Sequence, residues 1–134
     1  MSDIEKINTE IADVVKFINS GKAIKPLLDD IYLISVDIAG LYYVENIDEI
    51  FAKLKKGTHL DLYREKNNTY DKKAVKIKYK DYKLGYVPRK HNIILANMMD
   101  AGKKLYAVVE KAGTDSVYEL DEYKYVKIKI YLKE

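Results

Sequence analysis

Two stretches of the chain alternate between apolar and polar residues, and this period of two restricts the possible folds more than any other feature. In residues 125–132 four aliphatic side chains alternate with lysine and tyrosine, and in residues 73–79 valine and isoleucine alternate with lysine. Successive side chains of a strand point to opposite faces. Both stretches are therefore predicted to be strands with one face in a core and the other in water.

Four further strands complete the predicted sheet, at residues 31–39, 60–64, 82–87 and 105–109. In the first of these, Tyr32, Ile34, Val36 and Ile38 are expected on one face. Lys80 and Asp81 form the turn between residues 73–79 and 82–87, although a two-residue turn prefers glycine or asparagine. Residues 113–122 are polar and acidic and are predicted to form an exposed loop.

Two helices are expected between these strands. A capping box at Asn46–Glu49 predicts a short helix over residues 47–56, with Gly57 as its stop. His91 or Asn92 is expected to cap the second helix, which ends at Gly102 and has a predicted buried face of Ile94, Leu95, Met98 and Met99. Six short strands with two helices indicate a small, partly open barrel in the mainly β, α+β class.

The N-terminal residues predict an additional amphipathic helix. Ser2 and Glu5 form a capping box, Gly21 is a plausible stop, and the apolar stripe between them consists of Ile4, Ile7, Ile11, Val14, Val15 and Ile18. This stripe is expected to pack on the barrel, on a second copy of the chain or on another protein. The predicted division is an N-terminal helix and connector, residues 1–30, followed by a barrel domain, residues 31–134.

Composition excludes several classes of site. The chain has no cysteine and only two histidines, His59 and His91, so neither a disulfide framework nor a metal centre is expected, and no cofactor is predicted. No apolar run approaches the roughly 20 residues that span a bilayer, and the N-terminus is charged. A cytoplasmic location is the expectation.

Positive charge is concentrated in residues 72–104, which contain ten Lys and Arg residues and only two Asp residues. This segment has a net charge of +8, in a chain whose net charge is +3. A basic cluster beside aromatic side chains is typical of nucleic-acid binding. A lysine-rich, solvated strand face is the alternative explanation.

The residues around this cluster resemble the HIRAN domain. The resemblance is carried by R-E-x-N-N-x-Y-D-x-x-A-V from Arg64 to Val75, by L-G-Y-V-P-R from Leu84 to Arg89, and by the helix opening on His91-Asn92. Ala39-Gly40 before a tyrosine pair and Asp100-Ala101-Gly102 fit the same pattern. The resemblance covers about residues 31–112. It implies a six-stranded OB-like or SH3-like barrel flanked by two helices, found in fork-remodelling translocases and as standalone bacterial proteins.

The same resemblance implies a pocket for the 3′ end of single-stranded DNA. Tyr42 or Tyr43 would stack on bases together with Tyr70, while Asp71 would accept a hydrogen bond from the terminal hydroxyl. Asn68 would shape the loop, and Arg89 would pair with a phosphate. The other predicted site residues are Tyr86, Lys90, His91 and Asn92. The chain departs from the pattern at Leu41, Thr69 and Tyr86, where some relatives have a basic residue, proline and histidine.

Other interpretations remain open at this stage. The tyrosines could instead pack their rings at the edge of the core and keep their hydroxyls in water. Asn67, Asn68 and Asp71 are residue types that form turns. Arg64 could form a structural ion pair with Asp71 or Glu65. A protein-interaction adaptor acting through the N-terminal helix, or an RNA-binding module, is the alternative function. No nucleophile elbow, phosphate loop or helicase motif occurs, so no enzyme is expected. A helicase or nuclease partner would supply any ATP-driven or cleavage step.

Overall fold

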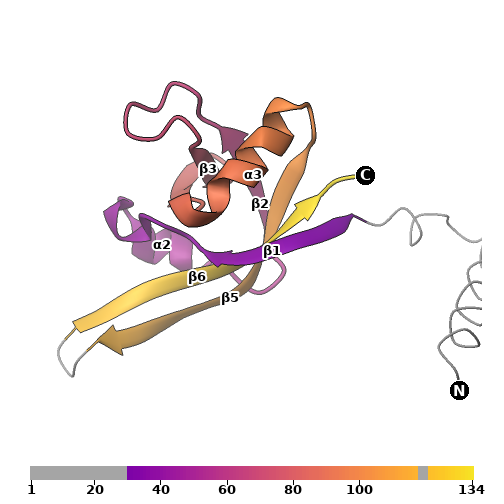
Figure 1. Ribbon diagram of the computed structural model, residues 1–134. Coiled ribbons are helices and arrows are strands. Elements are labelled where there is room, and N and C mark those ends of the chain that lie inside the picture. Colours follow the sequence, from indigo (N-terminus) through magenta and orange to yellow (C-terminus); the bar gives the residue numbers. More distant parts are fainter. Residues whose placement is uncertain (1–29, 118–120) are drawn as a thin grey trace, which may run out of the picture. The chain divides into compact units, whose positions relative to one another are not determined.

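The computed structural model describes residues 30–117 and 121–134 (Figure 1). The predicted N-terminal helix lies outside the described residues, so the boundary between residues 30 and 31 stays a prediction. The described elements, in chain order, are strand β1 (Ile31–Asp37), the 3₁₀ turn η2 (Leu41–Tyr43), helix α2 (Ile47–Phe51), strands β2 (His59–Arg64), β3 (Val75–Tyr79) and β4 (Tyr82–Tyr86), helix α3 (Arg89–Asp100), and strands β5 (Leu105–Val117) and β6 (Asp121–Leu132).

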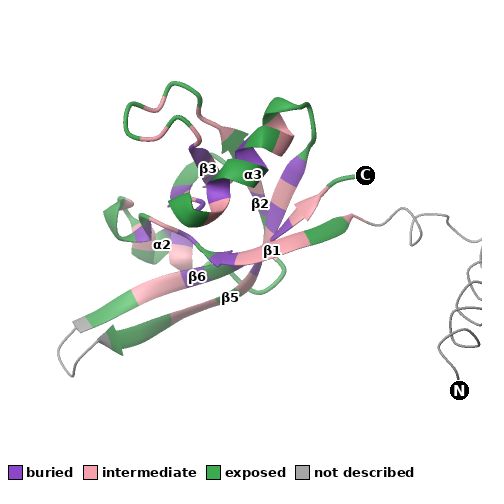
Figure 2. Cartoon of the chain, viewed as in Figure 1, coloured by how far each residue is buried: buried purple, intermediate pink, exposed green. Residues whose placement is uncertain are grey.

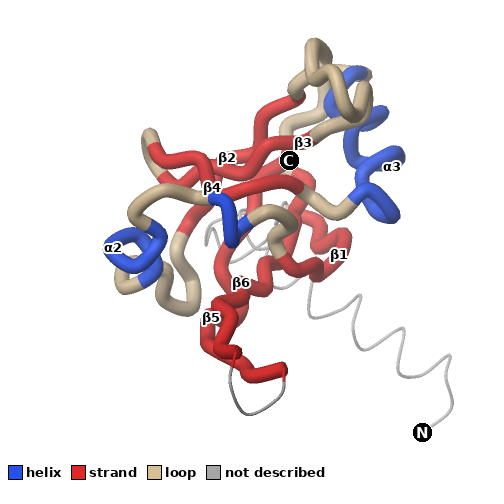
Figure 3. Tube along the Cα trace, turned by 90° about the vertical axis from the view of Figure 1, so that its left-hand side faces the viewer, coloured by secondary structure: helices blue, strands red, loops and turns tan. Residues whose placement is uncertain are grey.

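All six strands form one antiparallel sheet in the order β1-β6-β5-β2-β3-β4. The sheet curls until its two edges meet, because Ala39, just beyond β1, pairs with Tyr86 of β4. Two main-chain hydrogen bonds of 2.8 and 2.9 Å join these residues. Helices α2 and α3 lie on opposite sides of the curled sheet (Figure 3). The predicted fold class, a six-stranded half-barrel with two helices, is confirmed.

The core follows the alternation of the sequence. Val126, Ile128 and Ile130 of β6 are fully buried, as are Val75 and Ile77 of β3. Burial is concentrated in the curled part of the sheet, while the outer ends of β5 and β6 are exposed (Figure 2). Each fully buried aliphatic side chain contributes about 1.5–3 kcal/mol relative to leaving it exposed.

In β1 the expected inner face holds only in part. A register shift between Tyr32 and Ile34 interrupts its pairing with β6. Val36 and Ile38 are buried, whereas Tyr32 is 52% exposed and packs edge-on against Tyr131 at 5.8 Å between ring centroids. The prediction that Tyr32 shares the buried face is therefore wrong, because an extra residue in one strand disrupts its alternation.

Helix α2 ends five residues before the predicted limit at residue 56. Asn46 adopts a left-handed conformation and makes no side-chain capping bond, so the predicted capping box is absent. The segment after the helix is held by Thr58 instead, whose hydroxyl accepts from the Lys55 amide and donates to the Lys53 carbonyl. Such local side-chain bonds compete with helical ones.

Helix α3 begins at Arg89, directly after Pro88, rather than at His91 or Asn92. Its buried residues are Asn92, Leu95 and Ala96, while the predicted core residue Ile94 is 73% exposed. The cap is Pro88, with an extended ψ of 140°, so the helix begins three or four residues earlier than a cap at His91 or Asn92 would place it.

Strands β5 and β6 continue as a long two-stranded ribbon beyond the predicted strand ends. Gly113 pairs with Tyr125 and Ser116 with Glu122, so the predicted loop over residues 113–122 is wrong. A ribbon that is solvated on both faces shows no alternation of apolar residues, which is why the sequence pattern missed it. The tight turn at Lys80 and Asp81 is present, with Lys80 at a φ of 50°.

Candidate functional site

The loop between β2 and β3 is organised by the side chain of Asn68. Its Oδ1 accepts from the amides of Tyr70 and Asp71, at 2.9 and 3.0 Å, and its Nδ2 donates to Glu65 Oε1 at 2.9 Å. An asparagine that bonds the backbone ahead of it is a common turn device. The loop is thereby closed by its own polar groups, and Tyr70 is left 87% exposed.

Asp71 is held from three directions. Its Oδ1 accepts from the Lys73 amide at 2.9 Å, its Oδ2 accepts from Asn92 Nδ2 at 2.7 Å, and Arg89 Nε lies 3.7 Å from the same Oδ2. The Lys73 amide does most to lower the pKa of Asp71, with further lowering from the Asn92 amide and the Arg89 guanidinium. At neutral pH the group is therefore a fixed carboxylate that accepts hydrogen bonds.

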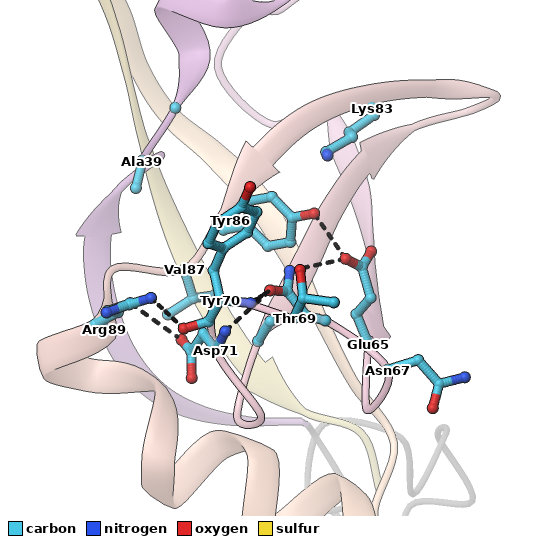
Figure 4. A pocket seen from close by; sticks show the side chains of 13 residues that line it. Ala39, Glu65, Asn67, Thr69, Tyr70, Asp71, Lys83, Tyr86, Val87 and Arg89 are labelled. Atoms are coloured by element: carbon cyan, nitrogen blue, oxygen red, sulfur yellow. Dashed lines mark hydrogen bonds and ion pairs between the residues drawn. The ribbon is translucent and has the colours of Figure 1, made fainter.

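A cavity of about 610 Å³ opens beside this loop (Figure 4). Its walls come from four places in the chain: Ala39 and Gly40 after β1; Glu65, residues 67–71 and Ala74 of the β2–β3 loop; Lys83, Tyr86 and Val87 in and after β4; and Arg89 at the start of α3. The Ala39–Tyr86 bridge draws the first and third of these together. Segments that are distant in sequence thus enclose one hollow with aromatic, cationic and carboxylate groups.

Glu65 and Lys83 belong to this cavity although neither was predicted as a site residue. The Tyr86 hydroxyl donates to Glu65 Oε1 at 2.8 Å, and this bond is the main reason that the pKa of Glu65 is lowered. Lys83 Nζ lies 4.5 Å from the centroid of the Tyr86 ring. The position of Glu65 in the R-E-x-N-N motif was an available signal for it. Lys83 showed none beyond the local excess of lysine.

Tyr42 and Tyr43 lie on η2, whose Leu41 is buried and anchors the turn. Their side chains are 88% and 85% exposed, and their rings meet edge-on at 5.6 Å. Tyr43 lines a second hollow of about 540 Å³, which shares Gly40, Lys83 and Tyr86 with the cavity. Tyr42 lines a third hollow, which shares Gly40 alone with it.

The structure therefore brings together five of the predicted site residues in one cavity: Asn68, Tyr70, Asp71, Tyr86 and Arg89. Three further predicted residues, all on α3, do not line the cavity. Lys90 and His91 line a separate apolar hollow with Ile93 and Ile94, and Asn92 is 2% exposed, with its amide on Asp71. The observed place of Asn92 is behind the cavity, where it orients the carboxylate.

Arg64 has a structural role, but not with the partners that the sequence suggested. Its guanidinium pairs with both carboxylate oxygens of Asp100, at 2.9 and 3.2 Å, and also donates to the carbonyls of Lys72 and Ala74. The hydrogen bond from Arg64 is the main cause of the lowered pKa of Asp100. This side chain links the end of β2 to the end of α3 and to the loop.

Within residues 30–117 and 121–134, no group of three or more acidic or histidine side chains is placed to hold a metal ion. In the same described part of the chain, no helix has the length and apolarity to cross a membrane.

Comparisons with known proteins agree with the fold. A family model described as the HIRAN domain matches residues 31–134. A crystal structure of a protein from Lactobacillus plantarum is similar, with a TM-score of 0.60 and 27% identity over 77% of this chain and 97% of that one. The HIRAN domain of human HLTF has a TM-score of 0.51 at 20% identity, over 78% of this chain and 81% of that one, a likeness of fold alone. No curated protein sequence matches the chain.

Proposed function

Because the chain belongs to the HIRAN domain family, whose members are in general DNA-binding modules, we propose that it is a non-enzymatic module that binds single-stranded DNA at a free 3′ end. The proposed setting is DNA repair or replication-fork processing. The observation that carries the proposal is the cavity in which Tyr70, Tyr86, Asp71 and Arg89 converge.

Asp71 is the proposed partner of the terminal hydroxyl. A carboxylate offers about four acceptor positions, and two are used by the Lys73 amide and the Asn92 side chain. The carboxylate side chain is 23% exposed, which supports access for a further donor. A hydroxyl can donate to it, whereas a terminal phosphate would bring like charges together. This difference is the physical basis for selecting an end.

Tyrosine rings supply the proposed sequence-independent affinity. Tyr70 stands exposed at the mouth of the cavity, and Tyr43 stands exposed at the adjoining hollow. Stacking of a base on an aromatic ring contributes about 1–3 kcal/mol and tolerates any base. Two accessible rings from separate segments are consistent with stacking on terminal bases.

Arg89 is the proposed phosphate contact. Its side chain is 71% exposed, and its distance of 3.7 Å from Asp71 is long for an ion pair. One guanidinium nitrogen also donates to the Tyr70 carbonyl, so the group is oriented at the cavity mouth. Guanidinium groups bind phosphate oxygens through two parallel hydrogen bonds.

The test compares labelled trinucleotides that end in a 3′ hydroxyl or in a 3′ phosphate, in a fluorescence anisotropy titration at low salt. We expect the hydroxyl end to bind more tightly by roughly tenfold or more, because hydrogen bonds to charged groups contribute about 1.5–3 kcal/mol. Asp71→Ala should abolish this preference, and Asp37→Asn, at an exposed strand position, is the matched control. Equal affinities of the two ends would remove end recognition, and no binding of either would remove the DNA proposal.

A further inference from the structure

The outer face of β2, β3 and β4 carries a continuous group of lysines and tyrosines next to the cavity. It consists of Tyr63, Lys76, Lys78, Lys83 and Tyr86, and we call it the lysine–tyrosine face. Lys76 pairs in register with Tyr63 on one side and with Tyr86 on the other. The ammonium groups of Lys76 and Lys78 lie 5.9 and 5.4 Å from the centroid of the Tyr63 ring.

This face and the cavity share two residues. Lys83 and Tyr86 line the cavity, and Lys83 lies across it from Asp71 and Arg89 (Figure 4). A strand whose terminal hydroxyl binds Asp71 would therefore leave the cavity on the side of Lys83. Lys78 pairs with Lys83 in the neighbouring strand and so lies next along that route.

Charge distinguishes this route from the hollow that adjoins the cavity at Tyr43. That hollow shares Lys83 with the cavity, but it is also lined by Glu45 and Asp81, whose carboxylates repel a phosphodiester. The acids on the lysine–tyrosine side lie beside lysines of the face. Glu65 accepts from Tyr86 and lies 3.6 Å from Lys76 Nζ. Asp61 lies opposite Lys78 in register and is hydrogen-bonded to His59 Nε2 at 3.0 Å.

We propose that single-stranded DNA leaving the cavity runs across the lysine–tyrosine face, so that the chain binds a longer 3′-terminal segment than the cavity alone holds. This inference rests on the proposed function. Neighbouring strands lie about 4.8 Å apart, so β4 and β2 are separated by about 10 Å. A stacked strand rises about 3.4 Å per nucleotide, and the face therefore accommodates roughly three further nucleotides.

The experiment uses the full chain and oligothymidylates with a free 3′ hydroxyl, three and six nucleotides long. Affinity is measured at several salt concentrations, the trinucleotide by competition against the labelled hexanucleotide. We expect tighter binding and a steeper salt dependence for the hexanucleotide. Lys78→Gln should lower the hexanucleotide's salt slope by about 0.7, which is roughly an eightfold loss of affinity at 50 mM salt, and should leave the trinucleotide unchanged.

Lys103→Gln, beyond the C-terminal end of α3, is the control and should leave the affinity for both oligonucleotides unchanged. Equal affinity and equal salt slope for the two lengths would overturn the route, as would an unchanged hexanucleotide slope in Lys78→Gln. Failure of this route is distinguishable from failure of the proposed function, because the trinucleotide's preference for a 3′ hydroxyl over a 3′ phosphate is independent of Lys78.

Discussion

Single residues in the cavity combine a structural contact with an exposed group. Tyr86 is the clearest case, because its hydroxyl donates to Glu65 at 2.8 Å while its ring lies beneath Lys83. Asn68 bonds both the loop backbone and Glu65. The loop is thus fixed by buried or half-buried polar atoms, and the rings and charges that face the cavity are held in place before any ligand arrives, which reduces the ordering cost of binding.

Tyr86→Phe should remove the hydrogen bond to Glu65 and keep the ring beside Lys83. The free energy of unfolding should then depend less on pH in the acid range. The Tyr86 hydrogen bond lowers the pKa of Glu65, so the folded protein holds the proton there more weakly than the unfolded chain does. The stabilisation is then present above about pH 4, the usual range of free carboxyls, and is lost as pH falls through the lowered pKa. We expect Tyr86→Phe to cost about 1 kcal/mol at pH 7 and less at pH 3.

Urea unfolding of both proteins at the two pH values measures this difference, with Tyr82→Phe, an exposed ring of the same strand, as the matched control. The same loss at pH 3 and pH 7 would contradict the assigned role of Glu65. The ring itself remains in Tyr86→Phe, so stacking on a base should be unaffected.

Residue chemistry predicted part of this site before the structure. Tyr42, Tyr43 and Tyr70 fall outside the predicted strands and helices, and all three are exposed. The burial of Asn92 was not predictable, because the same residue type suits a helix cap, a ligand contact or a buried amide. Which of these applies depends on Asp71, twenty-one positions earlier in the chain, and local sequence does not report a contact at that separation.

Among the elements, β4 brings the cavity walls together, because its pairing with Ala39 closes the curled sheet. Gly85 makes this possible: a side chain there would place a Cβ 2.2 Å from the Ala39 carbonyl oxygen, and its φ of +151° is one that other residues rarely adopt. The absence of a side chain lets β4 approach Ala39, and the bridge between Ala39 and Tyr86 then positions the cavity walls.

Gly85→Ala should therefore be much more destabilising than Gly102→Ala. Gly102 also has a positive φ, +91°, but nothing lies within 4 Å of a Cβ built there, so only backbone strain of about 1–2 kcal/mol is expected. For Gly85→Ala the steric overlap is added, and we expect a loss on the order of 3 kcal/mol or more. Thermal or urea unfolding of the two variants measures the difference, and equal losses would show that the close approach is unimportant.

Element types were predicted better than element ends. The strands with a buried face were found from their alternation, while the outer half of the β5–β6 ribbon was missed, because its residues have no core to face. Helix α3 was predicted from its apolar spacing, yet its cap was placed three or four residues late. The prediction chose His91 or Asn92 because their side chains can cap a helix, whereas the observed helix begins directly after Pro88.

In the whole molecule, fold class and charge distribution were both visible in the sequence, but the convergence of the site was not. Spacing along a chain does not state which loops meet across a curled sheet. The resemblance to a known domain supplied that information for Tyr70, Asp71 and Arg89, and the cavity contains all three. Glu65 was signalled only by its position in the motif, and the place of Lys83 in the cavity was visible only in the folded arrangement.

Because the cavity residues that the structure describes all lie between positions 39 and 89, removal of residues 1–21 should leave DNA binding unchanged. The measurement is hexanucleotide affinity of the shortened chain against the full chain, with circular dichroism to verify that both are folded. A loss of affinity in a folded, shortened chain would contradict this expectation and favour a function carried by the N-terminal segment.

The bridge at Tyr86 has a consequence for how relatives of this chain can diverge. Its main chain seals the sheet, and its side chain faces the ligand space, so the two tasks are divided within one residue. If the cavity binds DNA as proposed, exchanging this ring for another side chain changes the ligand-binding wall and leaves the main-chain bridge in place. Under that proposal, ligand preference can differ between relatives while the closed sheet is retained.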